Sequence, residues 1–520
     1  MAYTGKARIV ECNRGGLTGA KSIDALAPYM MVHPSRNILL EKNGRRKRGG
    51  TAHLYGAALA GGPTILGIYR AIFASGTGYT LAATSDGYVY KDDTTTIKTG
   101  LSTTNYFSFQ YASGEDKVFI TDGANAVQQW NGAAATASDI SEPATDWTTT
   151  PPFQLLLHGK GASQRLWGIN KNAIYASKTY GAAGDLEKFV TSAEAIYILT
   201  DDGYGLVGGV EYGDRIMVFG KNKGYLIDDT DTTSSNWGYD PLQWDGGVAH
   251  WRLIIKTPND IVLMSEDGEI YSATAVQSYG DYKRASLTRG SWMHDWIKEY
   301  VDLTKIAQFH GVYDPVIRAV IIWVVRNGQT AVDTALVFFL DRQSPEESWM
   351  VFDNVNFASG YSATCSARVL AGTGQEKIYT GDASGFLWKL HEANRNDNSQ
   401  IINGQFRTIN DPVESPEVRK HFNKLHVVCT PQGDYDLSVK IWVDGSYKTT
   451  KTLNMRGSGA VLGSFTLDTD VLGGDDFISV STGLGYKGYR IQYEFYNNGL
   501  NQDFFISSYR TDWKPLGMQA

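Results

Sequence analysis

A hairpin unit recurs along most of the chain: an apolar strand, a turn rich in Asp, Asn and Gly, and a second aromatic or β-branched strand. Residues 79–91, YTLAATSDGYVYK, are one copy, and Asp86-Gly87 is a strong hairpin signal. The unit returns as KVFITDGANAVQQW, RLWGINKNAIYAS, RIMVFGKNKGYLI and IVLMSEDGEIYSA, which begin at residues 117, 165, 215 and 261. Successive copies start about 36 to 50 residues apart, which is the length of one four-stranded propeller blade.

A longer variant over residues 320–340 and KIYTGDASGFLWKL from Lys377 complete the series. We therefore expect a β-propeller of about six to eight blades. A set of β-sandwiches is the alternative, because sandwich hairpins also carry DG and NG turns, but it does not explain the spacing. Closing a ring also hides sheet edges that invite aggregation. The segment before the first copy is predicted to supply the strand that completes the last blade.

The pattern changes after His391. The stretch HEANRNDNSQ is polar and rich in Asn, which is typical of a linker. Beyond it, Leu437, Val439 and Ile441 alternate with polar residues, so one face of this strand is expected to be buried. The candidate strands are 404–408, 425–429, 437–443, 463–467, 489–496 and 504–509. The predicted division is an N-terminal arm over 1–55, a propeller over 56–395, and a C-terminal β-sandwich of about six to eight strands over 396–520.

Composition agrees with an all-β chain of more than one domain. The 520 residues include 56 Gly but 14 Pro, with 30 Tyr, 20 Phe and 13 Trp, which suits many short strands around large cores. Two short helices are expected as packing elements. One begins at Ser291 with Trp292, Trp296 and Tyr300 on one stripe, and the other begins at Ser415-Pro416.

Charge and cysteine content narrow the classes of function. A formal net charge of −7 argues against a groove-reading DNA-binding protein. Cys12, Cys365 and Cys429 are too few and too far apart for a disulfide framework, which suits assembly in a reducing cytoplasm. The sequence has no signal-peptide pattern and no apolar run of membrane-spanning length. We expect a soluble protein without membrane insertion.

The sequence motifs do not predict an enzyme, a metal or a cofactor. GLGYKG at residues 483–488 matches G-x-G-x-x-G, but a strand pattern follows it where a dinucleotide site needs a helix. The phosphate-loop, zinc-helix and nucleophile-elbow patterns do not occur. His421 and His426, the closest histidines, are spaced unsuitably for a compact zinc set. Turn chemistry explains the Asp residues of the Asp-Gly turns, with calcium as the alternative.

One hairpin resembles a motif of an enzyme family. TGDASGFLW, residues 380–388, is similar to the Asp-box hairpin of sialidase propellers, with one residue more before its Gly. The other copies lack the terminal Trp at that place, and no arginine cluster can be assigned to a carboxylate-bearing sugar. A glycosidase is therefore the lesser alternative.

The strongest charge feature is KNGRRKRGG, in which Lys42, Arg45, Arg46, Lys47 and Arg48 crowd seven residues. We call these five side chains the basic cluster. They are candidates for contact with DNA phosphate, which would add salt-dependent affinity without sequence specificity. A solvated turn or an intersubunit salt-bridge patch is the alternative, and the one that we favour.

Four phrases carry a resemblance to a protein family: RNILLEKNGRRKRGGTAHLY, GIYRAIFASGTGYTLAATSDGYVYKDD, FITDGANAVQQWNG and GVEYGDRIMVFGKNKGYLID. With an N-terminal arm, a propeller and a terminal sandwich, the chain resembles tail nozzle or tail-hub proteins of short-tailed, P22-like phages. These proteins are also described as packaged-DNA stabilisation proteins. The resemblance spans nearly the whole sequence.

The resemblance implies a virion structural protein of the phage tail, made and assembled in the host cytoplasm. It implies a homohexameric ring that contacts the adaptor of the head-to-tail connector and a tail plug, spike or fibre. Such a ring retains the packaged genome and passes double-stranded DNA at ejection without reading its sequence. The acidic net charge is compatible with a mildly repulsive lumen. The alternative function is a propeller lectin or adhesin that binds host glycans.

Overall fold

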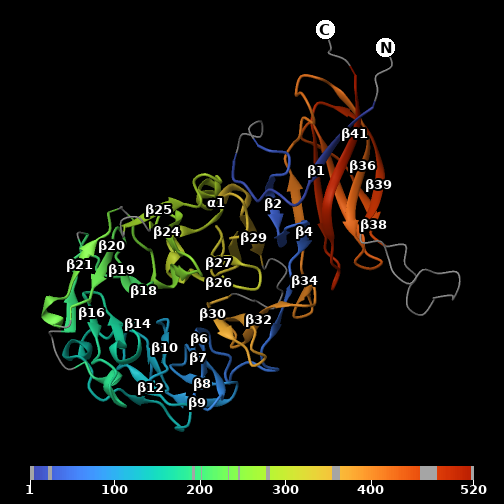
Figure 1. Cartoon of the computed structure of the whole chain (residues 1–520). Helices are drawn as coiled ribbons and strands as arrows, with labels where there is room; N and C mark the ends of the chain where they lie inside the picture. The colour runs from blue at the N-terminus through green and yellow to red at the C-terminus, as the bar shows by residue number, and fades with distance from the viewer. Residues whose placement is uncertain are drawn as a thin grey trace.

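The computed structural model describes residues 5–20, 26–189, 194–200, 202–231, 233–243, 246–276, 281–353, 363–456 and 477–516. Almost all of its regular structure is strand. Seven sheets, each with four antiparallel blade strands, follow one another around a ring, and two sandwich sheets of six and five strands pack beside it (Figure 1). The predicted all-β fold, a propeller followed by a sandwich, is confirmed.

The propeller has seven blades, within the predicted range. Blades 1 to 3 contain β6 (Ile65–Ile72), β7 (Gly78–Thr84), β8 (Val89–Lys91), β9 (Thr95–Lys98), β10 (Ser108–Ala112), β11 (Lys117–Thr121), β12 (Gln128–Trp130), β13 (Ser138–Asp139), β14 (Gln154–His158), β15 (Arg165–Ile169), β16 (Ala173–Ala176) and β17 (Ala195–Tyr197). Blades 4 and 5 contain β18 (Gly208–Tyr212), β19 (Arg215–Phe219), β20 (Gly224–Asp228), β21 (Gly238–Pro241), β22 (Ile254–Lys256), β23 (Ile261–Met264), β24 (Ile270–Val276) and β25 (Asp281–Ser286). Blade 6 contains β26 (His310–Asp314), β27 (Ala319–Val324), β28 (Thr334–Phe339) and β29 (Trp349–Asp353).

Blade 7 is completed by the N-terminal arm. Its first three strands are β30 (Cys365–Leu370), β31 (Glu376–Gly381) and β32 (Leu387–Glu392), and its fourth is β5 (Gly50–His53). The arm strand pairs antiparallel with β32. The first strands of neighbouring blades lie side by side around the whole ring, including β30 beside β6. Backbone hydrogen bonds from the arm therefore close the ring.

The sandwich contains more strands than the sequence predicted. One sheet has β3 (Ile38–Glu41), β4 (Gly44–Lys47), β41 (Phe505–Pro515), β36 (Lys420–Thr430), β39 (Ile478–Gly488) and β1 (Lys6–Glu11). The other has β2 (Met31–Arg36), β35 (Gly404–Thr408), β40 (Ile491–Asn497), β37 (Asp436–Val443) and β38 (Ser446–Asn454). The additional strands are β38 and β39, which lie between predicted strands, and β1 to β4 of the arm, whose long-range pairing no local pattern reports. The predicted strand 463–467 lies outside the described residues.

The stretch after His391 is not a linker. Asn396–Asp397 and Gln400–Ile401 form the short strands β33 and β34, and β33 pairs in parallel with β5. Asn396 and Asp397 are buried. Their packing is close, since a Cβ on Gly50 would lie 1.9 Å from the carbonyl oxygen of Asn396. Asn396 and Asp397 therefore have buried partners, whereas Asn394, Asn398 and Ser399 of this stretch are exposed.

One of the two predicted helices is present. Helix α1 (Met293–Tyr300) follows Ser291, whose hydroxyl accepts a hydrogen bond of 3.4 Å from the Met293 backbone N–H. Ser415-Pro416 starts only a turn, in which the Val418 N–H donates to the Ser415 carbonyl over 3.4 Å. The remaining helical turns are η1 (Thr145–Thr148), η2 (Gly161–Ser163), η3 (Asp185–Glu187), η5 (Ser234–Asn236), η6 (Trp251–Leu253), η7 (Leu303–Gln308) and η8 (Pro345–Glu347).

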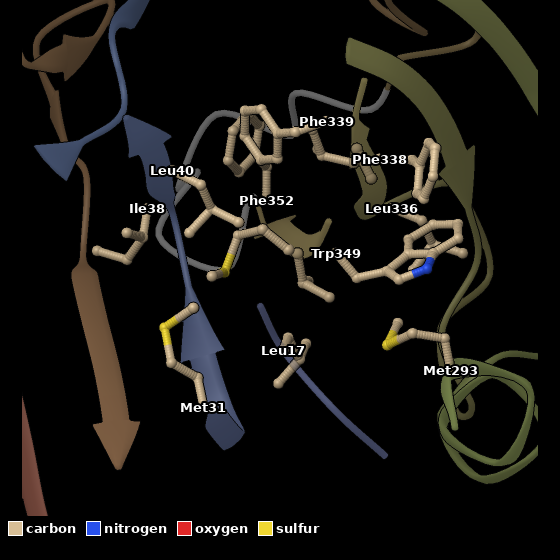
Figure 2. Close-up of a cluster of buried hydrophobic side chains, with 14 of the residues drawn as sticks. Leu17, Met31, Ile38, Leu40, Met293, Leu336, Phe338, Phe339, Trp349 and Phe352 are labelled. Atoms are coloured by element: carbon tan, nitrogen blue, oxygen red, sulfur yellow. The ribbon is translucent and has the colours of Figure 1, made fainter. Parts of the chain in front are cut away.

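An apolar cluster joins the propeller to the arm (Figure 2). Trp349 of β29 is fully buried and lies 4.9 Å, between ring centroids, from Phe338 of β28. On the other side of the cluster are Leu17, Met31 and Ile38 of the arm. Since one continuous core includes blade 6 and strands of both sandwich sheets, the two parts share buried apolar surface.

The Asp-box-like hairpin of blade 7 is a structural turn. Asp382 is buried, and one carboxylate oxygen accepts from the Ser384 and Phe386 backbone N–H groups over 2.8 and 2.9 Å. The other oxygen accepts from the Trp388 indole N–H over 2.8 Å. The carboxylate therefore holds the turn against the following strand.

We predict that Asp382→Asn lowers the free energy of unfolding by about 1 to 3 kcal/mol. An amide has one acceptor atom, so either the Trp388 indole or the turn backbone would face an N–H₂ group. Urea denaturation measures the change. Asp267→Asn in the Asp-Gly turn of blade 5, where Asp267 is exposed, is the matched control and is expected to change stability by less than about 0.5 kcal/mol. Equal effects of the two substitutions would contradict the prediction.

Candidate functional site

The basic cluster lies where the propeller meets the sandwich, at the end of β4 and before β5. Arg45, Lys47 and Arg48 are 1%, 0% and 6% exposed, so the prediction of a solvated turn is wrong for these three. Arg46 is half-buried and Lys42 is exposed. Strand pairing on both sides of this short segment carries the three buried side chains into the interior.

Carboxylates of the same chain neutralise two of these arginines. The Arg48 guanidinium makes a bidentate contact with Asp397 over 2.9 and 2.6 Å, and Thr51 donates to the same carboxylate over 3.0 Å. Arg46 Nε donates to Asp503 over 2.8 Å. Bidentate arginine–carboxylate contacts are strong and directional. These two arginines are therefore occupied within the chain, without a phosphate or a neighbouring subunit.

Arg45 is stabilised without a carboxylate. Its guanidinium donates to the backbone carbonyl of Arg14 over 3.0 Å and to that of Tyr29, and it lies 4.7 Å from the centre of the Phe406 ring. Carbonyl dipoles and an aromatic face disperse a guanidinium charge well. Arg45 thus connects the arm to the sandwich sheet that contains β35.

Lys47 is a buried amine with neutral partners. Its Nζ donates to the Asn497 side-chain oxygen and to the Gly499 carbonyl, both over 3.2 Å. Burial disfavours the charged ammonium and lowers its pKa from 10.5 to about 8. The unfolded chain therefore holds this proton to a higher pH than the folded chain does.

We predict that the wild type gains stability relative to Lys47→Met as the pH rises from about 8 to about 10.5. In this range the unfolded state binds more protons at residue 47, and stability rises with pH wherever that holds. The expected gain is roughly 1 to 3 kcal/mol, measured by urea denaturation at several pH values. Lys42→Met, at an exposed position, is the control, and its difference from wild type should not change with pH. A pH-independent difference for Lys47→Met would overturn the prediction.

A second set of buried polar side chains connects the junction to blade 6. Asn37 Nδ2 donates to Asp353 over 2.8 Å, and Arg36 donates to the other oxygen of that carboxylate over 2.7 Å. His391 contacts the fully buried Asp314. These bonds join the end of β2 and the end of β32 to blade 6. Hydrogen-bonded charges of this kind hold surrounding elements in one arrangement, because a shift leaves a polar group unpaired.

The formal net charge does not describe the surface. Among the described residues, twelve carboxylate side chains are buried but only five lysine or arginine side chains are. Much of the excess negative charge is therefore inside the protein. The net charge therefore does not support the expectation of an acidic, repulsive lumen.

The other sequence motifs are structural. The GLGYKG motif lies within strand β39, so its backbone N–H groups have strand geometry and not that of a phosphate-binding loop. His426 contacts Asp512 over 3.0 Å on the neighbouring strand. Within the described residues, no three His, Cys, Asp or Glu side chains are grouped to hold a metal ion. In the same part of the chain, no helix is long and apolar enough to span a membrane.

Two larger hollows open elsewhere on the surface. One, of about 580 Å³, lies beside Trp292, which is 54% exposed, and is lined also by Tyr29, Asp295 and Glu346. The other, of about 640 Å³, lies between blades 4 and 5 and is lined by both acidic and basic side chains. Sequence reasoning did not find these hollows, because their residues come from separate loops.

No family model and no curated protein matches the sequence. A solved structure of BBS1N in complex with ARL6DN is similar at 12% identity and a TM-score of 0.41, covering 70% of this chain and 99% of that one. YCF48 bound to D1 peptide is similar at 10% identity and a TM-score of 0.39, covering 66% and 96%. The propeller assignment rests on the strand pairing described above.

Proposed function

We propose that this protein is a structural component of the tail of a short-tailed phage, a nozzle or hub that forms part of the DNA conduit. The resemblance of its phrases and domain order to such tail proteins motivates the proposal. The observation that supports it best is the junction, where the arm contributes strands to both parts and the Arg48–Asp397 and Arg36–Asp353 ion pairs join the arm to propeller sheets.

A conduit that retains a packaged genome must bear load between its parts. Domains joined by a small polar interface normally move relative to each other. Here the chain runs from β1 to β4 in the sandwich, enters blade 7 as β5, and returns to the sandwich after β32. Hinge motion would have to break the Arg48–Asp397 contact and the shared core. The subunit is thus suited to hold a fixed position in a ring.

In this proposal the protein confines DNA within a ring and catalyses no reaction. Repeated copies form a ring, proposed as a hexamer, between an adaptor and a plug, spike or fibre. The buried arginines and lysine of the basic cluster stabilise the subunit and are not proposed as DNA contacts. DNA passes along the ring axis without sequence readout, as expected where base edges are not contacted.

The decisive experiment is cryo-electron microscopy of whole particles, together with the solution mass of the purified protein. We expect a multi-subunit ring on the tail axis below the portal. A protein that is monomeric in solution and absent from the tail axis, or present only on peripheral spikes, would overturn the proposal.

Glycan binding is the second candidate function, and one observation favours it. Trp292 is exposed beside a hollow that also presents the carboxylates of Asp295 and Glu346. An aromatic face with nearby polar groups is the common chemistry of a sugar site. Binding on a glycan array that is lost in Trp292→Ala would favour this function, whereas an array without binding would exclude it for the glycans tested.

A further inference from the structure

The axis of the propeller holds a cavity of about 280 Å³. Its walls come from the first strands of six blades, β6, β10, β14, β22, β26 and β30, together with the turn before β22. The polar side chains at the cavity include Tyr69, Ser108, Gln154, Trp251, Arg252, His310 and Ser366. None belongs to the junction or to a predicted site.

Among the described residues, Arg252 is the only lysine or arginine of the cavity wall, and it is 8% exposed. Its two Nη atoms donate to the backbone carbonyls of Thr364 and Ala307, both over 2.9 Å. Its Nε has no hydrogen-bond partner among the described residues. The guanidinium also lies against the Tyr106 ring. No carboxylate of the described residues forms an ion pair with it, unlike Arg48 at the junction.

The two histidines near Arg252, His250 and His310, carry no charge. His310 Nε2 contacts the Ala363 carbonyl over 2.8 Å, and a carbonyl only accepts, so Nε2 carries the proton. His310 Nδ1 therefore accepts from the Ser366 hydroxyl over 2.9 Å. His250 Nδ1 accepts from the Arg252 backbone N–H over 3.2 Å. Burial, with the Arg252 charge adding to it, lowers the pKa of both histidines to about 3. Both are neutral, and Arg252 leaves a net positive charge at the cavity.

Other groups at the cavity are hydrogen-bond donors or are already satisfied. The Ser108 hydroxyl accepts from the Leu155 N–H over 3.1 Å, and its own proton makes no hydrogen bond within the described residues. Gln154 exchanges two hydrogen bonds, of 2.9 and 2.8 Å, with the Gly209 backbone. A ligand at this place therefore meets a fixed cation and a hydroxyl donor, but no carboxylate of the residues that the structure describes.

We propose that the axial cavity binds a small oxyanion, either a phosphate-like ion or a carboxylate, against Arg252. A buried charge is costly unless an opposite charge or several hydrogen bonds compensate it. The two carbonyl contacts hold the guanidinium in place while its charge faces a cavity large enough for an anion and water. The Ser108 hydroxyl supplies a second donor. An anion held by Arg252 and Ser108 would also link blades 2 and 5, because Ser108 begins blade 2 and Arg252 precedes blade 5.

The test is titration of the purified full chain with inorganic phosphate at constant ionic strength, followed by thermal unfolding and ³¹P NMR line width. A parallel titration with acetate distinguishes carboxylate ligands from phosphate-like ligands, and chloride is the reference ion. We expect a saturable rise in Tm with phosphate, acetate or both, beyond that with chloride. Arg252→Met is expected to weaken binding roughly tenfold to hundredfold, since a hydrogen bond between charged groups is lost.

Arg165→Met is the matched control. Arg165 also donates to a backbone carbonyl and lies over an aromatic ring, that of Trp237, but it has the carboxylate partner Glu194 at 2.9 Å. This variant should keep the anion response. A wild type whose response to phosphate and acetate equals that to chloride would overturn the proposal, as would an Arg252→Met variant that binds like wild type.

A second measurement does not depend on the folding of any variant. Crystals of the wild-type protein grown with tungstate, a heavy analogue of phosphate, would show anomalous density where the ion binds. Density beside Arg252 in the axial cavity is the expected result. Tungstate sites elsewhere but not in this cavity would show that the cavity does not bind phosphate-like ions. The same crystals with bromoacetate would decide whether it binds a carboxylate.

Discussion

Asp397→Ala is expected to lower the free energy of unfolding by about 3 to 5 kcal/mol. The substitution leaves the Arg48 guanidinium buried at the junction without the carboxylate that it contacts through two bonds. It also removes the acceptor of the Thr51 hydroxyl in the strand that closes the ring. Urea denaturation followed by Trp fluorescence measures the loss. We expect the sandwich and the closing strand to lose structure together, because both depend on this contact.

Asp341→Ala is the matched control for the junction pair. Asp341 contacts Arg318 over 2.9 Å, but these side chains are 48% and 64% exposed, so the expected change is about 0 to 1 kcal/mol. The double variant Arg48→Met, Asp397→Leu should recover part of the stability that Asp397→Ala loses, since no charge is then buried alone. A loss below about 1 kcal/mol in Asp397→Ala would show that the pair does not stabilise the junction.

Trp349→Ala is the second substitution with a large expected effect, a loss of about 3 to 5 kcal/mol. Trp349 is fully buried among side chains of blade 6 and the arm (Figure 2). Its indole N–H donates to the Leu287 carbonyl over 3.0 Å, and its own carbonyl accepts from the Leu17 N–H over 2.7 Å. The substitution creates a cavity and leaves the Leu287 carbonyl without this donor.

The same denaturation measurement tests this prediction. Trp292→Ala is the control, because Trp292 is 54% exposed and a surface substitution is expected to change stability by about 0.5 kcal/mol or less. We also expect limited proteolysis of Trp349→Ala to cut first within the arm, whose Leu17 segment packs on the lost side chain. Similar stability of the two Trp variants would mean that the cluster does not hold the arm to blade 6.

The propeller could be predicted because its signals are local. Asp86-Gly87 and Asp267-Gly268 each specify a turn between two strands a few residues apart, and the repeat of such hairpins gives the blade length. Helix α1 was predicted for the same reason, since Ser291, Trp296 and Tyr300 lie within ten residues, but Trp292 of the predicted stripe precedes the helix and is exposed. Ser415-Pro416 carries a similar start signal, but the chain enters the long strand β36 five residues later. There tertiary pairing overrides a local preference.

The basic cluster could not be placed from the sequence. Five charges in seven residues are typical of a solvated surface, and no local pattern reports the carboxylates that meet them. Asp397 and Asp503 lie roughly 350 and 460 residues further along the chain, by the positions of these contacts. The polar stretch around Asn396 was assigned to a linker for the same reason. Its partners, Arg48 and β5, come from the other end of the chain.

Sequence patterns predicted the all-β class, the repeating blades and the change of pattern near residue 391, because turn chemistry and strand alternation depend on neighbouring residues. Tertiary contacts were needed to show that arm strands also enter the sandwich, that the basic cluster is buried, and that Arg252 lies at the axial cavity without a carboxylate among the described residues. Each of these depends on contacts between distant segments. The energy of a charged side chain is set by the groups that surround it after folding, and not by its neighbours in sequence.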